Sequence, residues 1–600
     1  MNSGGPVHFA KSTVGAVSVW AAIHFLVVSV AATAGTVRVG FEAQFDGQPV
    51  RFDTPAHSTD AGQAISITRL DFLLSEFALR ETTGSWSASS NRFAYVSARE
   101  GGGTFALTGI PPGDYDRIRF RVGVPPVENH ANPGALPAAH PLNPNFNGLH
   151  WNWQGGYVFL ALEGRWGGDN GYSFHLATDP LLMTVELPIS LAMQDAADLS
   201  ISLDIAGIFS YPHRIVVETD TASTHSRDGD RFALQLRDNV ERAFCIGPPV
   251  TRLVATALST NPPGAPLIAA GATPHPLRFP AYFPQPALPS DNPLTEEGVE
   301  LGQRLFHDIR LSAGERQSCA SCHQPDAAFV DRNRRFSVGV AGRAGSRNSM
   351  PLLNLAWKSA FFWDGSAPSL RVQVLQPIEN PDEMNESLSN VVAKLQAPGV
   401  SVDYPSRFAA AFGSREISAD RIARALEQFL LAQVSHDSKF DRSFAGRVHL
   451  NDEERRGFEL FHTEHDPRRG QFGADCFHCH GGPLFQSQGF ANNGLDAVGV
   501  DTGRFVVTVR EGDRGKFAVP SLRNVAVTAP YMHDGRFGTL EEVVEHYASG
   551  VKRSATLDPN LAKHPDGGVP LAADDKRALV AFLRTLTDER FAPAGHARVP

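Results

Sequence analysis

The chain has 600 residues and a formal net charge of −10 at pH 7, with 42% hydrophobic and 20% charged residues. This length predicts more than one domain. The negative balance is mild and no block rich in lysine or arginine occurs, so the composition does not favour nucleic acid as a partner.

The N-terminus has the features of an export signal. Lys11 precedes an apolar stretch from about Val14 to Ala32, and Ala32-Thr33-Ala34 is a small-x-small cleavage pattern. We therefore predict a signal peptide over residues 1–34 and a periplasmic location. The apolar run is close to the ~20 residues needed to span a bilayer, so a retained membrane anchor is the alternative.

Residues 35–245 have the pattern of a β-rich domain. Apolar and polar residues alternate, for example over 36–41, 117–122 and 199–205, with Gly, Pro and Asp turns between them. This pattern predicts an all-β sandwich. Twelve of the 46 residues from Pro248 to Pro293 are proline, which predicts a semi-extended linker over residues 246–290.

The remaining residues, 291–600, show helical periodicity with helix start signals. The segments 294–306, 418–430 and 540–547 carry it most clearly. We expect this half to be all-α, so the predicted fold class is multidomain, an all-β sandwich followed by an all-α part.

Two short motifs in the helical half carry the chemistry. Cys319-Ala-Ser-Cys322-His323 and Cys476-Phe-His-Cys479-His480 lie 157 residues apart and use four of the five cysteines. In C-x-x-C-H, the two thiols attach haem covalently and the histidine binds its iron. The chain is therefore predicted to carry two haems c. Paired cysteines binding zinc or forming disulfides are the alternative, but zinc needs further ligands at suitable spacing.

The fifth cysteine, Cys245, belongs to neither motif. Its neighbours in Ala-Phe-Cys-Ile are apolar. We expect an inert buried thiol there, although an unpaired cysteine in an exported chain also suits an intermolecular bridge.

Further motifs connect the haem-binding half to a family. They are Glu300-Leu-Gly-Gln-Arg-Leu-Phe306, Phe362-Trp-Asp-Gly365, Glu383-Met-Asn385, Val519-Pro-Ser-Leu-Arg-Asn524 and Ala529-Pro-Tyr-Met-His-Asp-Gly535. With these motifs in order, residues 275 to 595 resemble the bacterial di-haem cytochrome c peroxidases, and within them the MauG-like and MbnH-like enzymes that oxidise tryptophan in a partner protein. The resemblance implies two cytochrome c lobes, a peroxidatic one over 291–450 and an electron-transfer one over 451–600.

The resemblance also implies roles for individual residues. Glu383 would move a proton between the two oxygens of bound peroxide, and Gln373 and Pro377 match other positions of the same distal pocket. Trp363 matches a tryptophan that lies between the two haems and shortens the electron path. A calcium ion between the lobes would be bound by oxygen atoms of three residues, which are Asn348, Thr528 and Pro530.

Two departures place the chain within the family. Peroxide-scavenging members have a histidine between the first haem motif and Phe-Trp-Asp-Gly, but residues 324–362 contain none. The first haem should therefore be open to peroxide. At the second haem, Tyr547 replaces the usual methionine ligand, and no methionine follows Met532. A phenolate stabilises ferric and higher states. His546 is a rival ligand, and Tyr547 could instead be a packed side chain.

The N-terminal half carries a second resemblance. His150-Trp-Asn-Trp-Gln-Gly-Gly-Tyr-Val-Phe159 and Gly171-Tyr-Ser-Phe-His175-Leu resemble MbnP-like copper-binding proteins, in which a di-haem partner converts a tryptophan to kynurenine. Trp151 and Trp153 are then the candidates for oxidation, on one face of a strand with His150 on the other. Imidazole suits copper, and the candidate ligands are His57, His150 and His175. The alternative is a ligand-free sandwich with loop histidines.

Together these features predict a secreted enzyme that uses hydrogen peroxide, through a bis-ferryl-like state delocalised over Trp363, to oxidise a tryptophan of its own copper-binding module. The reaction could occur in cis or with a second copy. One alternative is a peroxidase that takes electrons from a small redox protein. Another is a non-catalytic copper-handling protein with redox haems, which would have a low-spin, six-coordinate first haem.

Overall fold

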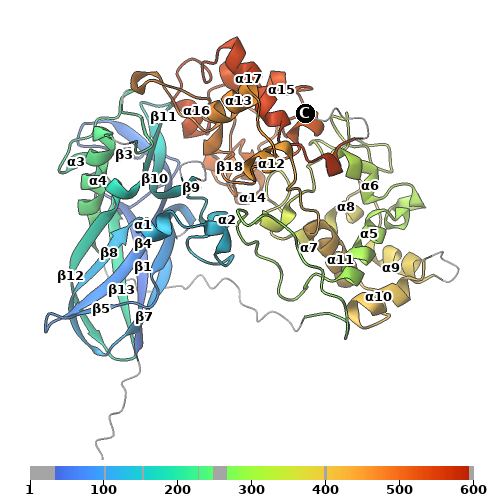
Figure 1. The fold of residues 1–600 in the computed structure, drawn as a ribbon, viewed down its shortest axis with the longest axis horizontal. Helices are drawn as coiled ribbons and strands as arrows, with labels where there is room; N and C mark the ends of the chain where they lie inside the picture. Colours follow the sequence, from blue (N-terminus) through green and yellow to red (C-terminus); the bar gives the residue numbers. More distant parts are fainter. Residues whose placement is uncertain are drawn as a thin grey trace, which may run out of the picture.

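The computed structural model describes residues 34–100, 103–151, 155–219, 221–227, 229–247, 266–397 and 402–593. Figure 1 shows a β-rich N-terminal module, blue to green, beside a larger C-terminal module, green to red. Most of the predicted signal peptide, part of the predicted linker and Trp153 lie outside the described residues. Among the residues described, no helix is long and apolar enough to cross a membrane.

The smaller sheet of the N-terminal module has β1 (Gly35–Phe45) at its centre. β1 runs parallel to β13 (Ala196–Asp204) and antiparallel to β2 (Gln48–Pro49) and β7 (Thr104–Ile110), and β13 pairs with the edge strand β15 (Phe244–Ile246). Cys245 lies on β15 and is exposed. The prediction of a buried thiol is therefore wrong: Phe244 points into the core and the alternation of the strand turns Cys245 outward.

The larger sheet is built on β4 (Ala64–Glu81). Its strand order is β12 (Met183–Met193), β8 (Gly113–Val122), β4, β10 (Gly156–Trp166), β11 (Asn170–Ala177) and β14 (Ser223–Thr224). The short strands β3 (His57–Ser58), β5 (Trp86–Ala88) and β6 (Phe93–Ser97) also pair with β4, and β9 (His150–Trp151) pairs with β10. Inward apolar residues of both sheets form one core, including Phe41, Phe72 and Phe174. The β-rich prediction is confirmed for this module.

Helices of the N-terminal module are few. They are α1 (Pro126–Asn129), α2 (Pro144–Asn147), α3 (Ile205–Ser210) and α4 (Arg231–Ala243). Asp230 caps α4, accepting hydrogen bonds from the amides of Phe232 and Ala233. The buried face of α4 joins the sandwich core through Phe232, Leu236 and Val240.

Each half of the C-terminal module has its own core and one close helix pair. In the first half α5 (Glu296–Phe306) packs on α11 (Ala419–Leu431), and in the second α13 (Asp452–Phe461) packs on α17 (Ala573–Arg584). A Cβ on Gly302 would overlap the carbonyl of Ala425, and one on Gly457 would overlap that of Ala578. Both halves therefore use a glycine to bring two helices together.

The other elements of this module are short. Its remaining helices are α6 (Cys319–Cys322), α7 (Leu370–Gln373), α8 (Gln376–Glu379), α9 (Leu388–Gln396), α10 (Tyr404–Phe412), α12 (Lys439–Phe444), α14 (Phe505–Thr508), α15 (Leu540–Glu545) and α16 (Pro559–Ala562). Two strand pairs occur, β16 (His465–Asp466) with β17 (Gln471–Phe472) and β18 (Phe490–Ala491) with β19 (Phe517–Ala518).

The prediction of an all-α C-terminal half is wrong. This region is only about 31% helical. Residues 323–369, all of them described, contain short 3-10 turns and no α-helix. Helical periodicity was strong in a few segments, but the chain around each haem motif consists of long loops whose turns are set by Gly, Pro and Asn residues rather than by helix packing.

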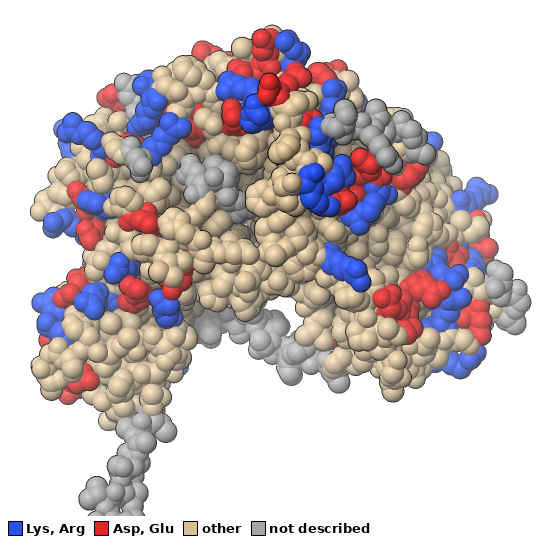
Figure 2. Space-filling view, in the orientation of Figure 1, with Lys and Arg blue, Asp and Glu red and all other residues tan. Residues whose placement is uncertain are grey.

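The two modules of the chain are packed against each other. Phe477, from the second haem motif, belongs to an apolar cluster otherwise made of N-terminal residues such as Leu149, Trp151 and Tyr157. Arg99 donates to Asp513 at 2.9 Å, and α16 lies against β11, where a Cβ on Gly171 would overlap the carbonyl of Pro559. Charged residues of both signs are intermixed on the face in Figure 2, so no single-sign patch dominates it.

Candidate active site

The first haem motif is held by a one-turn helix. Ser318 and Ser321 form a capping box at the start of α6, and His323 follows directly after its end. Nδ1 of His323 lies 2.8 Å from the carbonyl oxygen of Phe329, which leaves Nε2 for iron. Burial lowers the pKa of His323, so the ring is neutral, as a ligand must be. Neither cysteine of α6 is in a disulfide.

The second haem motif repeats this chemistry. Cys476 and Cys479 are not in a disulfide, and Nδ1 of His480 lies 3.3 Å from the carbonyl oxygen of Phe485 and 3.2 Å from that of Pro520. Burial lowers the pKa of His480 to about 4. Two cysteines outside any disulfide, beside a neutral and oriented imidazole, fit a covalently bound haem at each motif.

The predicted peroxide pocket is formed by one continuous segment. Gln373 ends α7, Pro377 lies in α8, and the carbonyl of Pro377 accepts the amide of Met384 at 3.2 Å, which fixes the loop carrying Glu383. Burial raises the pKa of the Glu383 carboxyl, which accepts a hydrogen bond from Asn380 at 2.8 Å. The carbonyl of Glu383 accepts the amide of Val340 at 2.8 Å, which ties the Glu383 loop to the segment that follows the first haem motif.

Trp363 connects the two lobes. Its indole N–H donates to the carbonyl of Asn348 at 2.8 Å, and its own carbonyl accepts the amide of Ala518, in β19, at 2.7 Å. The amide of Asn348 donates to the carbonyl of His533 at 2.7 Å. Of the other predicted calcium ligands, Thr528 donates to the carbonyl of Val525 and Pro530 follows a cis peptide bond.

Tyr547 lies in a π-helical turn, His546–Gly550, that continues α15. Its hydroxyl accepts a hydrogen bond from Asn493 at 3.4 Å. Burial raises the pKa of the Tyr547 phenol. Nε2 of His546, the rival ligand, is 3.0 Å from the carbonyl of Asn493.

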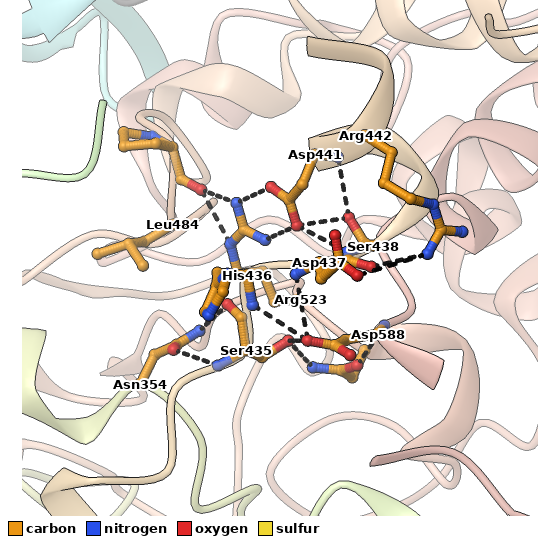
Figure 3. Close-up of polar contacts among 12 residues, drawn as sticks. Asn354, Ser435, His436, Asp437, Ser438, Asp441, Arg442, Leu484, Arg523 and Asp588 are labelled. Atoms are coloured by element: carbon orange, nitrogen blue, oxygen red, sulfur yellow. Dashed lines mark hydrogen bonds and ion pairs between the residues drawn. The ribbon is translucent and has the colours of Figure 1, made fainter. Parts of the chain in front are cut away.

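The Val519–Asn524 motif has a structural role that the sequence did not indicate. Arg523 makes two hydrogen bonds to Asp441, at 2.8 and 2.9 Å (Figure 3). Asn524 donates to Ser435 at 2.9 Å. Asp588 accepts from the amides of His436 and Asp437 at 3.1 and 3.2 Å. This buried network joins the two halves of the C-terminal module.

Trp151, one of the two predicted oxidation targets, lies at the module junction. It is 8% exposed, and its ring centroid is 6.4 Å from that of Phe477, inside the second haem motif. The rings of His225 and His175 lie at 5.7 and 6.0 Å. A cavity of about 160 Å³ adjoins Trp151, His225 and Phe477.

The three predicted copper ligands do not come together. Nε2 of His57 is 3.1 Å from the carbonyl of Arg51, and the His150 ring packs edge-on against Tyr157 at 4.6 Å. Only His175 belongs to a histidine cluster, whose other members are His225 and His478. Sequence reasoning missed both. His478 could have been noticed because it lies between the cysteines of a haem motif, whereas His225 has no such signal.

Comparison with known proteins decides the family. A family model described as di-haem cytochrome c peroxidase matches residues 296–449. The chain is 40% identical over 306 residues to the methylamine utilization protein MauG of Methylorubrum extorquens, covering 50% of this chain and 81% of that protein. The chain belongs to the di-haem cytochrome c peroxidase and MauG family. It is therefore a haem oxidoreductase that acts on peroxide, from a family with two haems c.

The same comparisons support the fusion. An MbnP model matches residues 34–226. The di-haem half is also 35% identical over 306 residues to the cytochrome c551 peroxidase of Nitrosomonas europaea, covering 50% of this chain and 82% of that protein. A solved MauG-like protein associated with microbial copper homeostasis is 34% identical, covering 53% of this chain and 99% of that one with a TM-score of 0.47. The two family models together confirm the predicted combination of a MauG-type enzyme with an N-terminal MbnP domain.

Proposed function

We propose that this MauG-family enzyme uses hydrogen peroxide to oxidise Trp151 of its own MbnP domain to kynurenine. One observation carries the proposal: the Trp151 ring packs at 6.4 Å against Phe477, which lies between the two cysteines of the second haem motif. A tryptophan in this place can lose electrons toward the second haem without entering a substrate pocket.

The oxidation balances with peroxide as the sole oxidant. Two molecules of hydrogen peroxide accept four electrons in all. The C2–C3 bond of the indole breaks, a carbonyl forms at each of these carbons, and two waters leave, giving N-formylkynurenine. Water then hydrolyses the formamide, releasing formate and kynurenine. The cavity of about 160 Å³ beside Trp151 has room for that water.

The chain's own residues supply proton transfer and positioning. When bound, the haems provide the two-electron chemistry with peroxide. Glu383 would accept a proton from one peroxide oxygen and return it to the other. Its raised pKa suits this task because the carboxyl can then both take up and release a proton closer to neutral pH. Trp363 fills the space between the lobes, and Gln373 and Pro377 shape the Glu383 loop.

Two further parts of the proposal are a calcium site between the lobes and export to the periplasm. Calcium would bind oxygen atoms of Asn348, Thr528 and Pro530 and hold the lobes in register. Asn348 supports this because it already contacts both the carbonyl of His533 and the indole of Trp363. Export to the periplasm would follow from the signal sequence over residues 1–34, in keeping with haems attached outside the cytoplasm.

Peptide mass spectrometry across residues 140–180 tests the proposal. The haem-loaded wild type and Glu383→Gln are compared before and after peroxide, with Trp166 as an internal control in the same region. We expect loss of one carbon and gain of one oxygen at Trp151 in the wild type alone. The same change at Trp153 instead would identify Trp153 as the oxidised residue. Unmodified tryptophans, together with fast peroxide turnover on added reduced cytochrome, would contradict the proposal. They would support a peroxidase that takes its electrons from a small redox protein.

A further inference from the structure

A second cavity lies in the C-terminal module, where Tyr282 reaches the surface. Its volume is about 370 Å³, and its lining includes Tyr282, Asp441, His436 and Ala445. The Tyr282 side chain is half-buried, and its hydroxyl donates to the Asp441 carboxylate at 2.7 Å. This cavity shares no lining residue with the one beside Trp151. It is therefore a separate place at which a small molecule can meet the enzyme.

Tyr282 begins a row of three aromatic rings that leads into the module. Its ring centroid is 5.3 Å from that of Phe283, and the Phe283 centroid is 5.5 Å from that of Trp357. Both inner rings are 0% exposed. The Trp357 indole N–H donates to the carbonyl of Pro284 at 2.6 Å, which fixes its ring. Tryptophan and tyrosine are among the side chains most easily oxidised by one electron, so this row can conduct electrons between the interior and the cavity.

The inner end of the row is connected to the second haem motif. The carbonyl of Trp357 accepts a hydrogen bond from the Gln486 side chain at 3.1 Å. Gln486 follows Phe485, whose carbonyl oxygen lies 3.3 Å from Nδ1 of His480, the predicted iron ligand. Two hydrogen bonds and the Phe485-Gln486 backbone therefore connect this ligand to Trp357.

We propose that Tyr282 is a second oxidation site, where the enzyme takes electrons from small phenols bound in the cavity. The volume lies in the range of small-molecule pockets and admits a one-ring phenol. Electron-rich phenols are oxidised more easily than tyrosine, so they can reduce an oxidised Tyr282. The inference rests on the family's action on peroxide and not on the oxidation of Trp151, so the two can fail separately.

The reaction balances with hydrogen peroxide as the oxidant. Tyr282 gives one electron through Phe283 and Trp357 toward the second haem, and its phenolic proton moves to Asp441. A bound phenol then gives one electron to Tyr282, Asp441 returns the proton, and the proton of the substrate phenol passes to water. Two such cycles supply the two electrons and two protons that convert one peroxide into two waters. They leave two phenoxyl radicals as products.

Asp441 is placed to accept the Tyr282 proton. Arg523 binds its carboxylate with two hydrogen bonds (Figure 3). Burial would raise the pKa of Asp441, but Arg523 holds it well below its usual range, so the carboxylate is ionised. A phenol that has lost an electron is a far stronger acid than a carboxylic acid, so the proton can still move to Asp441. In the resting protein, burial raises the pKa of Tyr282 and keeps the phenol protonated.

Peroxide-dependent oxidation of guaiacol, a one-ring methoxyphenol, tests the site in the haem-loaded full-length protein. We expect Tyr282→Phe to lower kcat/KM for guaiacol on the order of tenfold, with haem content unchanged. Ala445→Phe adds bulk to the cavity wall and leaves the aromatic row intact. It should raise KM for guaiacol and leave kcat unchanged, because it affects binding alone.

Trapping the radical is a readout that does not depend on turnover. A nitroso spin trap, added with peroxide and without phenol, should attach to Tyr282, and peptide mass spectrometry identifies the adduct. The adduct should be lost in Trp357→Phe. Tyr404→Phe is the matched control, because Tyr404 also donates to an arginine-paired aspartate, Asp308, whereas its ring contacts Phe408. This variant should oxidise guaiacol like the wild type.

Three results would overturn the proposal. They are a wild type that gives no adduct at Tyr282 or does not oxidise guaiacol, full guaiacol oxidation by Tyr282→Phe, and an equal loss in Tyr404→Phe. Haem content and thermal stability, measured for every variant, identify a folding defect. If Trp357→Phe has such a defect, the wild-type adduct and the KM of Ala445→Phe decide.

Discussion

Removing Arg523 should strongly destabilise the junction between the two haem lobes. Its side chain is 0% exposed and that of Asp441 is 2% exposed. Arg523 makes two hydrogen bonds to Asp441, and its guanidinium lies 4.7 Å from the Phe283 ring centroid. Breaking a buried ion pair by removing one partner costs about 3–5 kcal/mol, because the other charge stays buried. In Arg523→Ala, Asp441 keeps donors from Ser438 and Tyr282, so we expect the lower part of that range.

The cost should depend on pH. In the wild type, burial alone would raise the pKa of Asp441, but Arg523 holds it well below its usual range. The pair therefore stabilises the fold above the ordinary pKa of an aspartate, and this contribution is lost only as pH falls through the depressed value. Without Arg523, burial should raise the pKa of Asp441. The destabilisation should then be largest near neutral pH and shrink as the buried carboxyl takes up a proton.

Urea unfolding of the haem-loaded protein at pH 7 and pH 5, followed by circular dichroism and by tryptophan fluorescence, measures this cost. Arg442→Ala is the matched control from the same network (Figure 3), because Arg442 lies 3.9 Å from the Asp437 carboxylate, donates to the Asp437 carbonyl at 2.9 Å, and both side chains are partly exposed. The control should cost about 0–1 kcal/mol. Equal effects of the two variants, or a cost that does not shrink at pH 5, would refute the argument.

Three further predictions concern the haems. Glu383→Gln should slow peroxide consumption in stopped-flow by about 10²–10⁴-fold. The wild-type rate should rise with pH through a pKa above the ordinary carboxyl range. A variant as fast as the wild type would show that Glu383 does not transfer the proton. Tyr547→Phe should change the electron paramagnetic resonance spectrum of the second ferric haem, whereas His546→Ala should not; the reverse result would make His546 the ligand. Trp363→Phe should slow tryptophan oxidation with both haems still attached, and an unchanged rate would mean that Trp363 only packs between the lobes.

The haem chemistry could be predicted because it is local in sequence. Cys319, Cys322 and His323 lie within five residues, so covalent attachment and iron ligation depend on one turn of chain. The same holds for the second motif. The β-rich character of residues 35–245 was also readable, since alternation along a strand directly reflects which face is buried. The helix content of the C-terminal half could not be predicted, because amphipathic segments such as α5 and α11 give no information about the long loops between them.

The module junction was decided by tertiary structure alone. Trp151 and Phe477 are 326 residues apart, and they meet because strands of the MbnP domain pack on the loop of the second haem motif. His175, His225 and His478 likewise carry no common spacing or period. Their meeting depends on how two folded surfaces fit. Sequence by itself determined that the chain carries two haem-attachment motifs, because each motif is contained within five residues; the packing of one module on the other decided which tryptophan and which histidines lie beside the second motif.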